Sequence, residues 1–302
     1  MRILITGANG LLGQKLLDIL CADLSVQVLA TSRGDSRLSH LPEHITFESL
    51  DITNQQEVRT VVSEFSPDVI IHTAAMTNVD QCEEEREACW DLNVTAVKYL
   101  VEVAELCNAH FIHLSTDFIF DGENGPLTEV AEPSPVNFYG ESKMAAEKLV
   151  EASKTSWAIA RTILVYGVTP GMSRSNIILW VKNSLEKGET INVVNDQWRT
   201  PTLAEDLAQG CKLIAEQKAE GVYNISGKDF LTPYEMAIQT AKYFKLDLEQ
   251  IVETDGSKFK QKAKRPARTG FVIDKAIAQL GYQPRSFREG IAIVAEQISN
   301  KG

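Results

Sequence analysis

A tyrosine and a lysine four positions apart are the first residues here whose types and spacing suggest chemistry. Tyr139 and Lys143 stand in the run Tyr-Gly-Glu-Ser-Lys. Positions i and i+4 of an α-helix share one face, so the two side chains would lie together. A phenol has a pKa of about 10, and a nearby ammonium group lowers it by favouring the phenolate. The pair could therefore move a proton near neutral pH, although this spacing alone is most often structural.

Hydroxyl side chains come one strand and one loop before this pair. Ser115 and Thr116 follow an apolar run that starts at His110. Open α/β sheets bind ligands at the carboxyl ends of their strands. A hydroxyl there could hydrogen-bond a substrate carbonyl while the tyrosine supplies its proton. A turn or capping role for the two hydroxyls is the alternative.

A glycine-rich turn near the N-terminus predicts a dinucleotide site. The run Gly7-Ala8-Asn9-Gly10-Leu11-Leu12-Gly13 follows a short apolar segment and opens a segment with helical spacing. Glycines allow a tight turn and a close approach to a pyrophosphate, and the helix N-terminus offers free N–H groups. The spacing is G-x-x-G-x-x-G, which resembles the turn of extended short-chain dehydrogenases.

The end of the second expected strand bears on the choice between NADP and NAD. An acidic residue there would hold the ribose hydroxyls of NAD. This chain has no carboxylate at that tip, and has Ser32 and Arg33 instead. A guanidinium group matches a 2′-phosphate well, so we expect NADP(H). The alternatives are NAD(H) as the cofactor and Arg33 as an ordinary surface arginine.

The elements that must position these residues alternate between strand-like and helix-like patterns. Near-continuous apolar strands separated by helices predict a doubly wound parallel sheet, the Rossmann arrangement of the α/β class. The expected strands cover Ile3–Thr6, Val26–Ala30, Ile45–Leu50, Asp68–His72, His110–Ser115, Trp157–Val165 and Gly221–Ile225. The expected helices cover Leu11–Leu20, Gln55–Phe65, Asp91–Leu106 and a stretch from Ser142 to Val150.

The pattern loosens after Tyr166, which predicts a second, smaller α/β domain. We expect residues 1–165 and 200–226 to form the NAD(P)-binding domain. Residues 166–199 and 227–302 would form a discontinuous substrate-binding domain. The basic run between Lys258 and Arg268, which includes Lys260, is either a solvated loop or a wall facing a diphosphate.

Composition narrows the possible partners. The 302 residues carry a formal net charge of −11, and phosphate contacts need Lys and Arg, so nucleic acid is not an expected partner. No stretch reaches the roughly 18 uncharged apolar residues of a membrane span, and the N-terminus has no signal-peptide pattern, so we expect a cytoplasmic protein. Five cysteines without a C-x-x-C pair, and no H-x-x-x-H pair, predict reduced thiols and no protein metal cage.

Several short segments, taken in order, resemble the dTDP-4-dehydrorhamnose reductase group of extended short-chain dehydrogenases/reductases. The match covers nearly the whole chain. The Ser-Thr-Asp…Phe-Asp-Gly segment and the Asp-Gln…Pro-Thr segment are fairly specific to this group. The segments are the glycine turn, His72–Ala75, Leu92-Asn93, Ser115–Asp117 with Phe120–Gly122, Tyr139 with Lys143, Asp196-Gln197 with Pro201-Thr202, and Arg265-Pro266.

The resemblance implies a role for each matching residue. Thr116 would be the hydroxyl partner, with Ser115 as the fallback, Tyr139 the proton donor and Lys143 its pKa-lowering neighbour. The cofactor would lie against Gly7, Asn9, Gly10, Leu11, Leu12, Ser32, Arg33, Asp51, Ile52, Ala74, Ala75, Thr77, Asn93, Tyr139 and Lys143. The substrate would lie against Thr116, Asp117, Phe118, Tyr139, Gln197 and Arg199. By resemblance alone, relatives pair as homodimers and some use Mg²⁺.

Three residues depart from the group's pattern. Phe118 stands where tyrosine is usual, Leu164 where tryptophan is usual, and Arg199 where glycine is usual. All three belong to the substrate side, so they bear on the identity of the sugar rather than on the cofactor.

The resemblance implies an NAD(P)H-dependent reductase of a nucleotide-linked 4-keto sugar, first of all dTDP-4-dehydro-L-rhamnose. Two alternatives stay open. One is a sugar-nucleotide epimerase or dehydratase, and the other is a non-catalytic regulatory subunit that keeps the dinucleotide site, like the β subunit of methionine adenosyltransferase.

Overall fold

A seven-stranded parallel sheet forms the centre of the molecule in a computed structural model that describes residues 1–38, 41–172, 175–259 and 261–299. The strand order is β10-β6-β5-β4-β1-β2-β3, and every neighbouring pair is parallel. The order reverses between β1 and β4, which confirms the predicted doubly wound fold. The strands are β1 (Arg2–Thr6), β2 (Gln27–Ser32), β3 (Ile45–Ser49), β4 (Val69–His72), β5 (His110–Thr116), β6 (Trp157–Thr162) and β10 (Gly221–Asn224).

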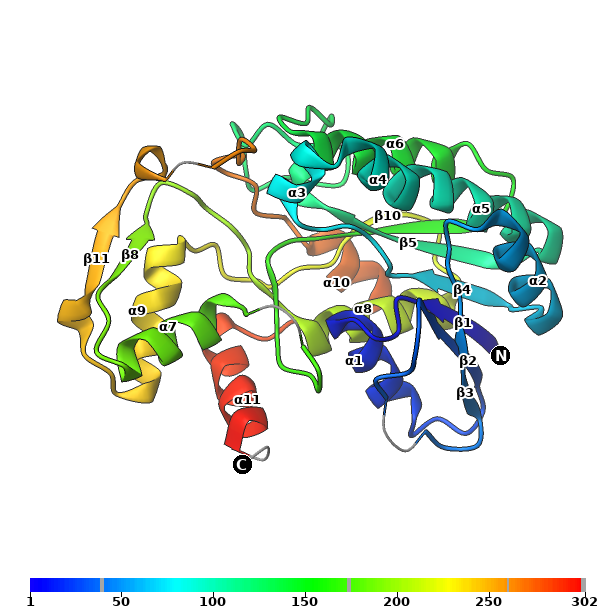
Figure 1. Cartoon of the computed structure of the whole chain (residues 1–302), viewed down its shortest axis with the longest axis horizontal. Helices are drawn as coiled ribbons and strands as arrows, with labels where there is room; N and C mark the ends of the chain where they lie inside the picture. The colour runs from blue at the N-terminus through cyan, green and yellow to red at the C-terminus, as the bar shows by residue number, and fades with distance from the viewer. Residues whose placement is uncertain (39–40, 173–174, 260, 300–302) are drawn as a thin grey trace.

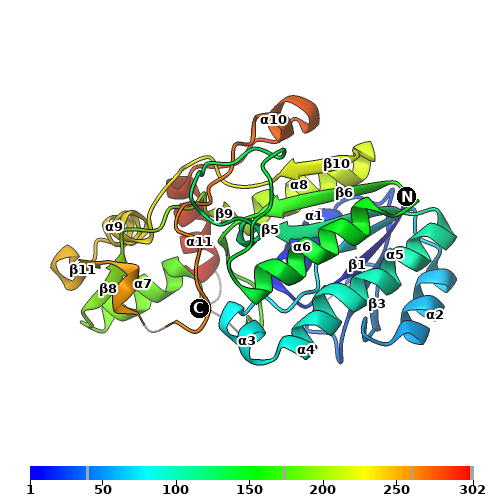
Figure 2. The ribbon, with the colours of Figure 1, turned by 90° about the horizontal axis from the view of Figure 1, so that it is seen from above.

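Helices cover both faces of this sheet (Figures 1 and 2). On one face lie α1 (Leu11–Leu20), α8 (Ala204–Gln217) and the short α10 (Asp274–Leu280). On the other face lie α2 (Gln55–Phe65), α5 (Ala96–Cys107) and α6 (Phe138–Glu151). Alternate strand residues enter the two hydrophobic clusters, because successive side chains of a strand point to opposite faces. This explains why the strands read as continuous apolar runs in the sequence.

A smaller group of elements lies beyond one end of the sheet (Figure 1). It contains α7 (Ile177–Glu186), α9 (Pro233–Phe244), α11 (Phe287–Ser299) and a parallel pair, β8 (Ile191–Val194) with β11 (Ile251–Thr254). At the junction, β7 (Val165–Tyr166) pairs with β9 (Thr202–Leu203). The division into two domains at the boundaries given above stays a prediction, and residues 300–302 of the second part lie outside the described residues.

The expected sixth strand is too long in the prediction. It ends at Thr162, because Leu164 takes a left-handed conformation with φ +41° that a strand cannot contain. The chain then resumes as β7, which pairs with β9 instead of continuing in the large sheet.

Two expected helices begin elsewhere than the pattern indicated. The helix expected from Asp91 starts with a π-helical turn over Asp91–Thr95 before α5, and two short helices, α3 (Val79–Glu84) and α4 (Arg86–Trp90), precede it. The helix expected from Ser142 already begins at Phe138, because the Asn137 side chain accepts a hydrogen bond from the Gly140 amide (2.8 Å) and caps it. In the described ranges no helix is both long enough and apolar enough to cross a membrane.

Candidate active site

The glycine turn leaves the N-terminus of α1 open to a ligand. Gly7 has φ +73°, and a Cβ there would lie 2.8 Å from the Ala74 amide nitrogen, so only glycine fits. A Cβ on Gly13 would lie 2.4 Å from the Gly7 carbonyl oxygen, which lets α1 pack closely on the turn. Gly10 caps the helix without any side-chain hydrogen bond, and no side chain of the described residues takes up the first N–H groups of α1. Such N–H groups suit a pyrophosphate. Leu11 and Leu12, half-buried, form this first turn.

Ser32 and Arg33, the two residues expected to face the adenosine end of the cofactor, lie at the tip of β2. Ser32 is half-buried and Arg33 is exposed. The pKa of Asp51, beyond β3, is lowered mainly by the hydrogen bond from the Thr53 hydroxyl, and also by the positive charge of Arg33. Ile52, the next residue, is buried. Arg33 therefore lies close enough to Asp51 to lower the pKa of that carboxyl group.

Asn9 joins the glycine turn to the loop after β2. Its side-chain oxygen accepts a hydrogen bond from the Arg37 amide (2.9 Å), and its amide group donates to the Asp35 carbonyl (3.0 Å). The side chain of Asn9 thus orders the loop that carries Arg33 and Arg37.

The Asn93 side chain holds the segment after β4 by hydrogen bonds to Met76. The Asn93 side chain accepts from the Met76 amide (2.8 Å) and donates to the Met76 carbonyl (3.1 Å) and to Ser142 Oγ (3.1 Å). Asn93 is only 1% exposed, so its observed contacts are with this segment. Three predicted cofactor residues belong to this segment: the half-buried Ala74 and Ala75 and the exposed Thr77.

Thr116 and Tyr139 are brought together at the carboxyl end of β5. The Thr116 hydroxyl lies close enough to the Tyr139 phenol to lower its pKa. Thr116 Oγ1 also donates to Asp117 Oδ1 (3.1 Å) and accepts from the Phe118 amide (3.3 Å). Ser115 Oγ, in contrast, is buried without a hydrogen-bond partner among the described residues. The geometry therefore associates Thr116, rather than Ser115, with the tyrosine.

The pKa of Tyr139 moves against our expectation. Burial raises the pKa of the phenol, and the hydrogen bond from Thr116 offsets part of this effect. We had expected Lys143 to bring the pKa below its usual value. Phe118 contributes to the burial, because its ring packs edge-on against the phenol ring with centroids 5.7 Å apart. Desolvation is the largest cause, and the nearby charge of Asp117 also disfavours the phenolate.

Lys143 is held against β5 by two acceptors. Its Nζ donates to the Leu114 carbonyl (2.6 Å) and lies 3.1 Å from His113 Nε2. Burial lowers the pKa of Lys143 to about 8, while the charge of Glu147 acts in the opposite direction. Burial and the charge of Lys143 together hold the pKa of His113 well below its usual range, so the imidazole is neutral and accepts from the ammonium.

A second neutral imidazole lies beside His113. The His72 ring stacks on the His113 ring with centroids 5.5 Å apart, and His72 Nδ1 lies 2.7 Å from Thr6 Oγ1. Burial lowers the pKa of His72 to about 3. Sequence reasoning did not single out His113, although it lies two residues before Ser115 on the same side of the strand.

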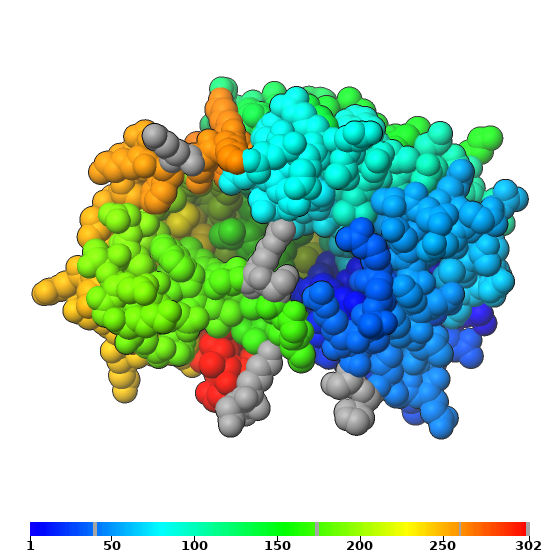
Figure 3. All heavy atoms as spheres, viewed as in Figure 1, coloured from blue at the N-terminus to red at the C-terminus, as the bar shows by residue number. Residues whose placement is uncertain are grey.

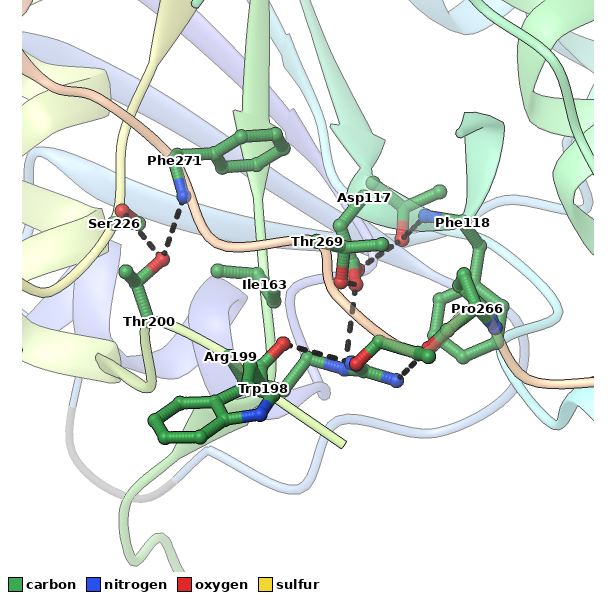
Figure 4. Close-up of polar contacts among 12 residues, drawn as sticks. Asp117, Phe118, Ile163, Trp198, Arg199, Thr200, Ser226, Pro266, Thr269 and Phe271 are labelled. Carbon is green, nitrogen blue, oxygen red and sulfur yellow. Dashed lines mark hydrogen bonds and ion pairs between the residues drawn. The ribbon is translucent and has the colours of Figure 1, made fainter. Parts of the chain in front are cut away.

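The predicted substrate residues divide into two groups. Phe118 and Gln197 are half-buried. Asp117 and Arg199 are buried, and Figure 4 shows them facing each other. We expected Arg199 on the substrate side, but its guanidinium group contacts backbone carbonyls and Asp117 inside the protein. Leu164, in contrast, is 42% exposed.

The basic run is paired with acidic residues of α3. Arg265 makes two contacts of 2.7 Å with the Asp80 carboxylate, and Lys262 pairs with Glu84. The Arg265 hydrogen bond, more than any other contact, holds the pKa of Asp80 well below its usual range. Lys260 lies outside the described residues. Figure 3 shows a recess between the cyan surface of α3 and the green surface of α7, beside this run.

The donor set does not support a metal ion. No three His, Cys, Asp or Glu side chains in the described ranges gather closely enough to bind one. We therefore derive no step through the Mg²⁺ that the resemblance implies.

The strand order and the glycine turn define a Rossmann-type protein. A family model described as "RmlD substrate binding domain" matches residues 1–300, and the chain belongs to this family.

Two relatives show the range of this family. A dTDP-4-dehydrorhamnose reductase from Aggregatibacter actinomycetemcomitans is 30% identical, over 96% of this chain and 97% of that protein. The methionine adenosyltransferase 2 subunit beta from Rattus norvegicus is 32% identical, over 81% of this chain and 72% of that protein.

Solved structures agree with this assignment. A dTDP-4-dehydrorhamnose reductase from Clostridium acetobutylicum superimposes with a TM-score of 0.88 and is 30% identical, over 99% of this chain and 100% of that one. A dTDP-4-dehydrorhamnose reductase from Bacillus anthracis, in complex with NADP, has a TM-score of 0.83 and is 28% identical, over 98% of this chain and 99% of that one.

Proposed function

We propose that this chain is an NADPH-dependent reductase that converts dTDP-4-dehydro-L-rhamnose to dTDP-L-rhamnose. One observation carries the proposal: Tyr139 lies beside the Thr116 hydroxyl at the carboxyl end of β5, and Lys143 lies one helical turn further along α6. This is the edge of the sheet at which the glycine turn opens. The reductases among the relatives support the substrate class.

The cofactor's phosphates would lie on the open N-terminus of α1, held by Gly7, Gly10 and the amides of the first turn. Ser32 and Arg33 would take a 2′-phosphate, which favours NADP over NAD, and the NADP complex of the Bacillus anthracis relative supports this choice. When bound, the reduced nicotinamide would supply the hydride for the keto carbon.

The protein's own part in the reaction is proton transfer and alignment. Tyr139 would donate its phenolic proton to the carbonyl oxygen as the hydride arrives. Because burial raises its pKa, the phenol keeps that proton until the substrate needs it. The Thr116 hydroxyl would help to orient the phenol and the carbonyl, and the Lys143 ammonium group would stabilise the phenolate that remains. Acid catalysis of this kind typically contributes about 10² to 10⁴ in rate.

The substrate class is tested by NADPH oxidation with a panel of nucleotide sugars. The panel pairs each 4-keto sugar with the corresponding alcohol, so that only the carbonyl differs. We expect oxidation with dTDP-4-dehydro-L-rhamnose and none with any alcohol. Failure of the purified protein to oxidise NADPH with every 4-keto sugar would contradict the proposal.

A dehydratase or epimerase is less compatible with the site. A dehydratase needs an acidic side chain free to act beside the hydroxyl, and the only candidate next to Thr116 is Asp117. Asp117 is buried, accepts from Thr269 Oγ1 (2.6 Å) and faces Arg199, so it is already occupied. Tightly bound NAD in the purified protein would nevertheless favour this class.

A regulatory subunit is the second candidate, favoured by the similarity to methionine adenosyltransferase 2 subunit beta. Isolation of one stoichiometric heterologous partner, together with no reductase turnover, would support it. The presence of Thr116, Tyr139 and Lys143 together favours the reductase.

The proposal includes the organisation of the chain. Residues 1–165 and 200–226 would bind the cofactor, and residues 166–199 and 227–302 would bind the sugar nucleotide. We further propose a cytoplasmic homodimer.

A further inference from the structure

A buried glutamine on α1 joins the glycine turn to the segment that leads into the smaller group of elements. Gln14 is 5% exposed, and its side-chain N–H groups donate to the Asn9 carbonyl (3.0 Å) and to the Pro170 carbonyl (3.2 Å). Its side-chain oxygen accepts from Thr169 Oγ1 (2.5 Å). A glutamine amide has two N–H donors and one acceptor oxygen, so both ends of the group are engaged. One side chain thus holds two segments that lie far apart in the sequence.

On the side of the cofactor site, Gln14 fixes one peptide unit of the glycine turn. The Asn9 carbonyl accepts from Gln14, and the amide of the next residue, Gly10, donates to the Gly7 carbonyl (2.8 Å). Because a trans peptide is planar, these two hydrogen bonds together set its orientation. The peptide unit that Gln14 holds therefore belongs to the turn that would carry the cofactor's pyrophosphate.

On the other side, the segment that Gln14 holds leads to α7. The Gly167 carbonyl accepts from the Asn176 side-chain amide (2.7 Å). The Asn176 side-chain oxygen caps α7, because it accepts from the amides of Ile178 and Leu179 (3.1 Å each). Figure 1 shows the green segment after β7 beside α1. Hydrogen bonds therefore connect the glycine turn with α7, which borders the recess in Figure 3.

Close packing strengthens this connection. A Cβ on Gly167 would lie 3.0 Å from Ala204 Cβ and 3.4 Å from Leu11 Cδ1, so the segment runs directly against the first turns of α1 and α8. A Cβ on Gly171 would lie 3.7 Å from Arg37 Cδ, on the loop after β2. Packed interiors have low compressibility and transmit small shifts, so a change at the glycine turn would reach the segment after β7.

We propose that Gln14 is a positioning residue that couples the two parts of the site: through Gln14, a cofactor bound at the glycine turn holds the segment after β7, and with it α7, in place for the sugar nucleotide. This inference rests on the proposed function, because it takes the glycine turn as the cofactor site and places the sugar nucleotide beside α7. Such coupling would serve hydride transfer, in which a misplacement of about 1 Å can cost about 100-fold in rate.

Hydrogen exchange in the full-length protein tests this coupling, with NADP⁺ alone, and then NAD⁺ alone, as the probe. In wild type we expect saturating cofactor to slow amide exchange about 5- to 10-fold in the glycine turn, in residues 167–169 and in the first turn of α7. Gln14→Met has a similar volume and no hydrogen-bonding amide. It should keep the effect on the turn and lose most of the effect on residues 167–169 and on α7.

Gln217→Met is the matched control. This glutamine, at the far end of α8, also donates to a distant backbone carbonyl, that of Leu280 (3.1 Å). It should respond to cofactor as wild type does. Equal slowing on α7 in wild type and in Gln14→Met, or slowing confined to the turn in wild type, would overturn the inference.

A second pair of variants removes the contact from the other side, which keeps the test decisive if Gln14→Met folds poorly. Thr169→Val lacks the hydroxyl that donates to Gln14, whereas Thr169→Ser keeps it. We expect Thr169→Val to lose the cofactor effect on α7 and Thr169→Ser to retain it, and equal behaviour of the two would overturn the inference. Absence of turnover with every 4-keto sugar would instead contradict the proposed function, because the exchange measurement needs neither a sugar nor turnover.

Discussion

Lys143 is a buried cation whose surroundings are arranged to keep it charged. The Leu114 carbonyl and the neutral His113 ring both accept from its ammonium group. A charged imidazole at His113 would repel the lysine, and burial prevents that charge. Because the pKa of Lys143 is about 8, the proposed support for the tyrosine phenolate would weaken as pH rises above this value.

We expect His113 to influence the pH above which kcat declines. His113→Leu removes an acceptor from the buried ammonium group, so the pKa of Lys143 should fall further. The decline of kcat with rising pH should then begin at lower pH than in wild type, where it should be centred near the pKa of about 8. His113→Gln, which keeps an acceptor oxygen, is the matched control. An unchanged alkaline limb in His113→Leu would contradict this role.

Residue types and spacing were enough to expect Tyr139 and Lys143 one turn apart on a helix and Thr116 at the end of a strand, and the structure has them on α6 and β5. They were not enough for Arg199, because its acceptors are the carbonyls of Pro266 and Ala267, more than sixty residues later in the sequence. The direction of a long side chain depends on which distant backbone groups come near it. The local sequence pattern does not indicate which groups these are.

Helix α6 carries both Tyr139 and Lys143, so its first turn determines where they lie. Asn137 caps this turn by accepting from the Gly140 amide and also donates to the Lys264 carbonyl (2.8 Å). A Cβ on Gly140 would lie 2.1 Å from the Phe118 carbonyl oxygen. The absence of a side chain at residue 140 thus lets the helix approach the end of β5, where Thr116 lies.

Gly140→Ala should therefore destabilise the protein by about 1–3 kcal/mol, as overpacking does. The reason is that the Phe118 backbone, unlike a flexible side chain, has little room to move. Glu141→Ala, at the exposed neighbouring position, serves as the control and should have a much smaller effect. Chemical denaturation measures both. Equal stability of Gly140→Ala and wild type would show that the close approach is not required.

Element boundaries were predictable where apolar periodicity ends at a polar turn, as for α2, which runs from Gln55 to Phe65 as expected. They were not predictable for β6. The sequence gives no sign of the positive φ of Leu164, after which the chain pairs as β7 with β9.

The two parts of the whole molecule are joined by the segment around Arg265. This arginine binds the Asp80 carboxylate of α3, and the Ala263 amide donates to the same carboxylate (3.0 Å). The alternation of strands and helices was sufficient to predict the parallel sheet. The pairing of β8 with β11 was not predictable, because the paired residues lie about sixty positions apart and other elements intervene.

Asp80→Asn should lower the stability of the whole molecule in a pH-dependent way. The folded-state pKa of Asp80 is depressed, so its contribution is present above the unfolded pKa of about 3.9 and is lost as pH falls through the folded value. The difference in urea midpoint between wild type and Asp80→Asn should be largest near neutral pH and should shrink below about pH 4. A difference that stays constant over this range would contradict the role of the Arg265 contact.

The most direct test of the central claim is the rate of NADPH oxidation with dTDP-4-dehydro-L-rhamnose by wild type and by Tyr139→Phe. The substitution removes only the phenolic oxygen, so folding and NADPH binding should be preserved and can be checked by Tm and by nicotinamide fluorescence. We predict turnover to dTDP-L-rhamnose by wild type and a kcat about 10² to 10⁴ lower in the variant. Equal rates for the two proteins would contradict the claim that Tyr139 donates the proton.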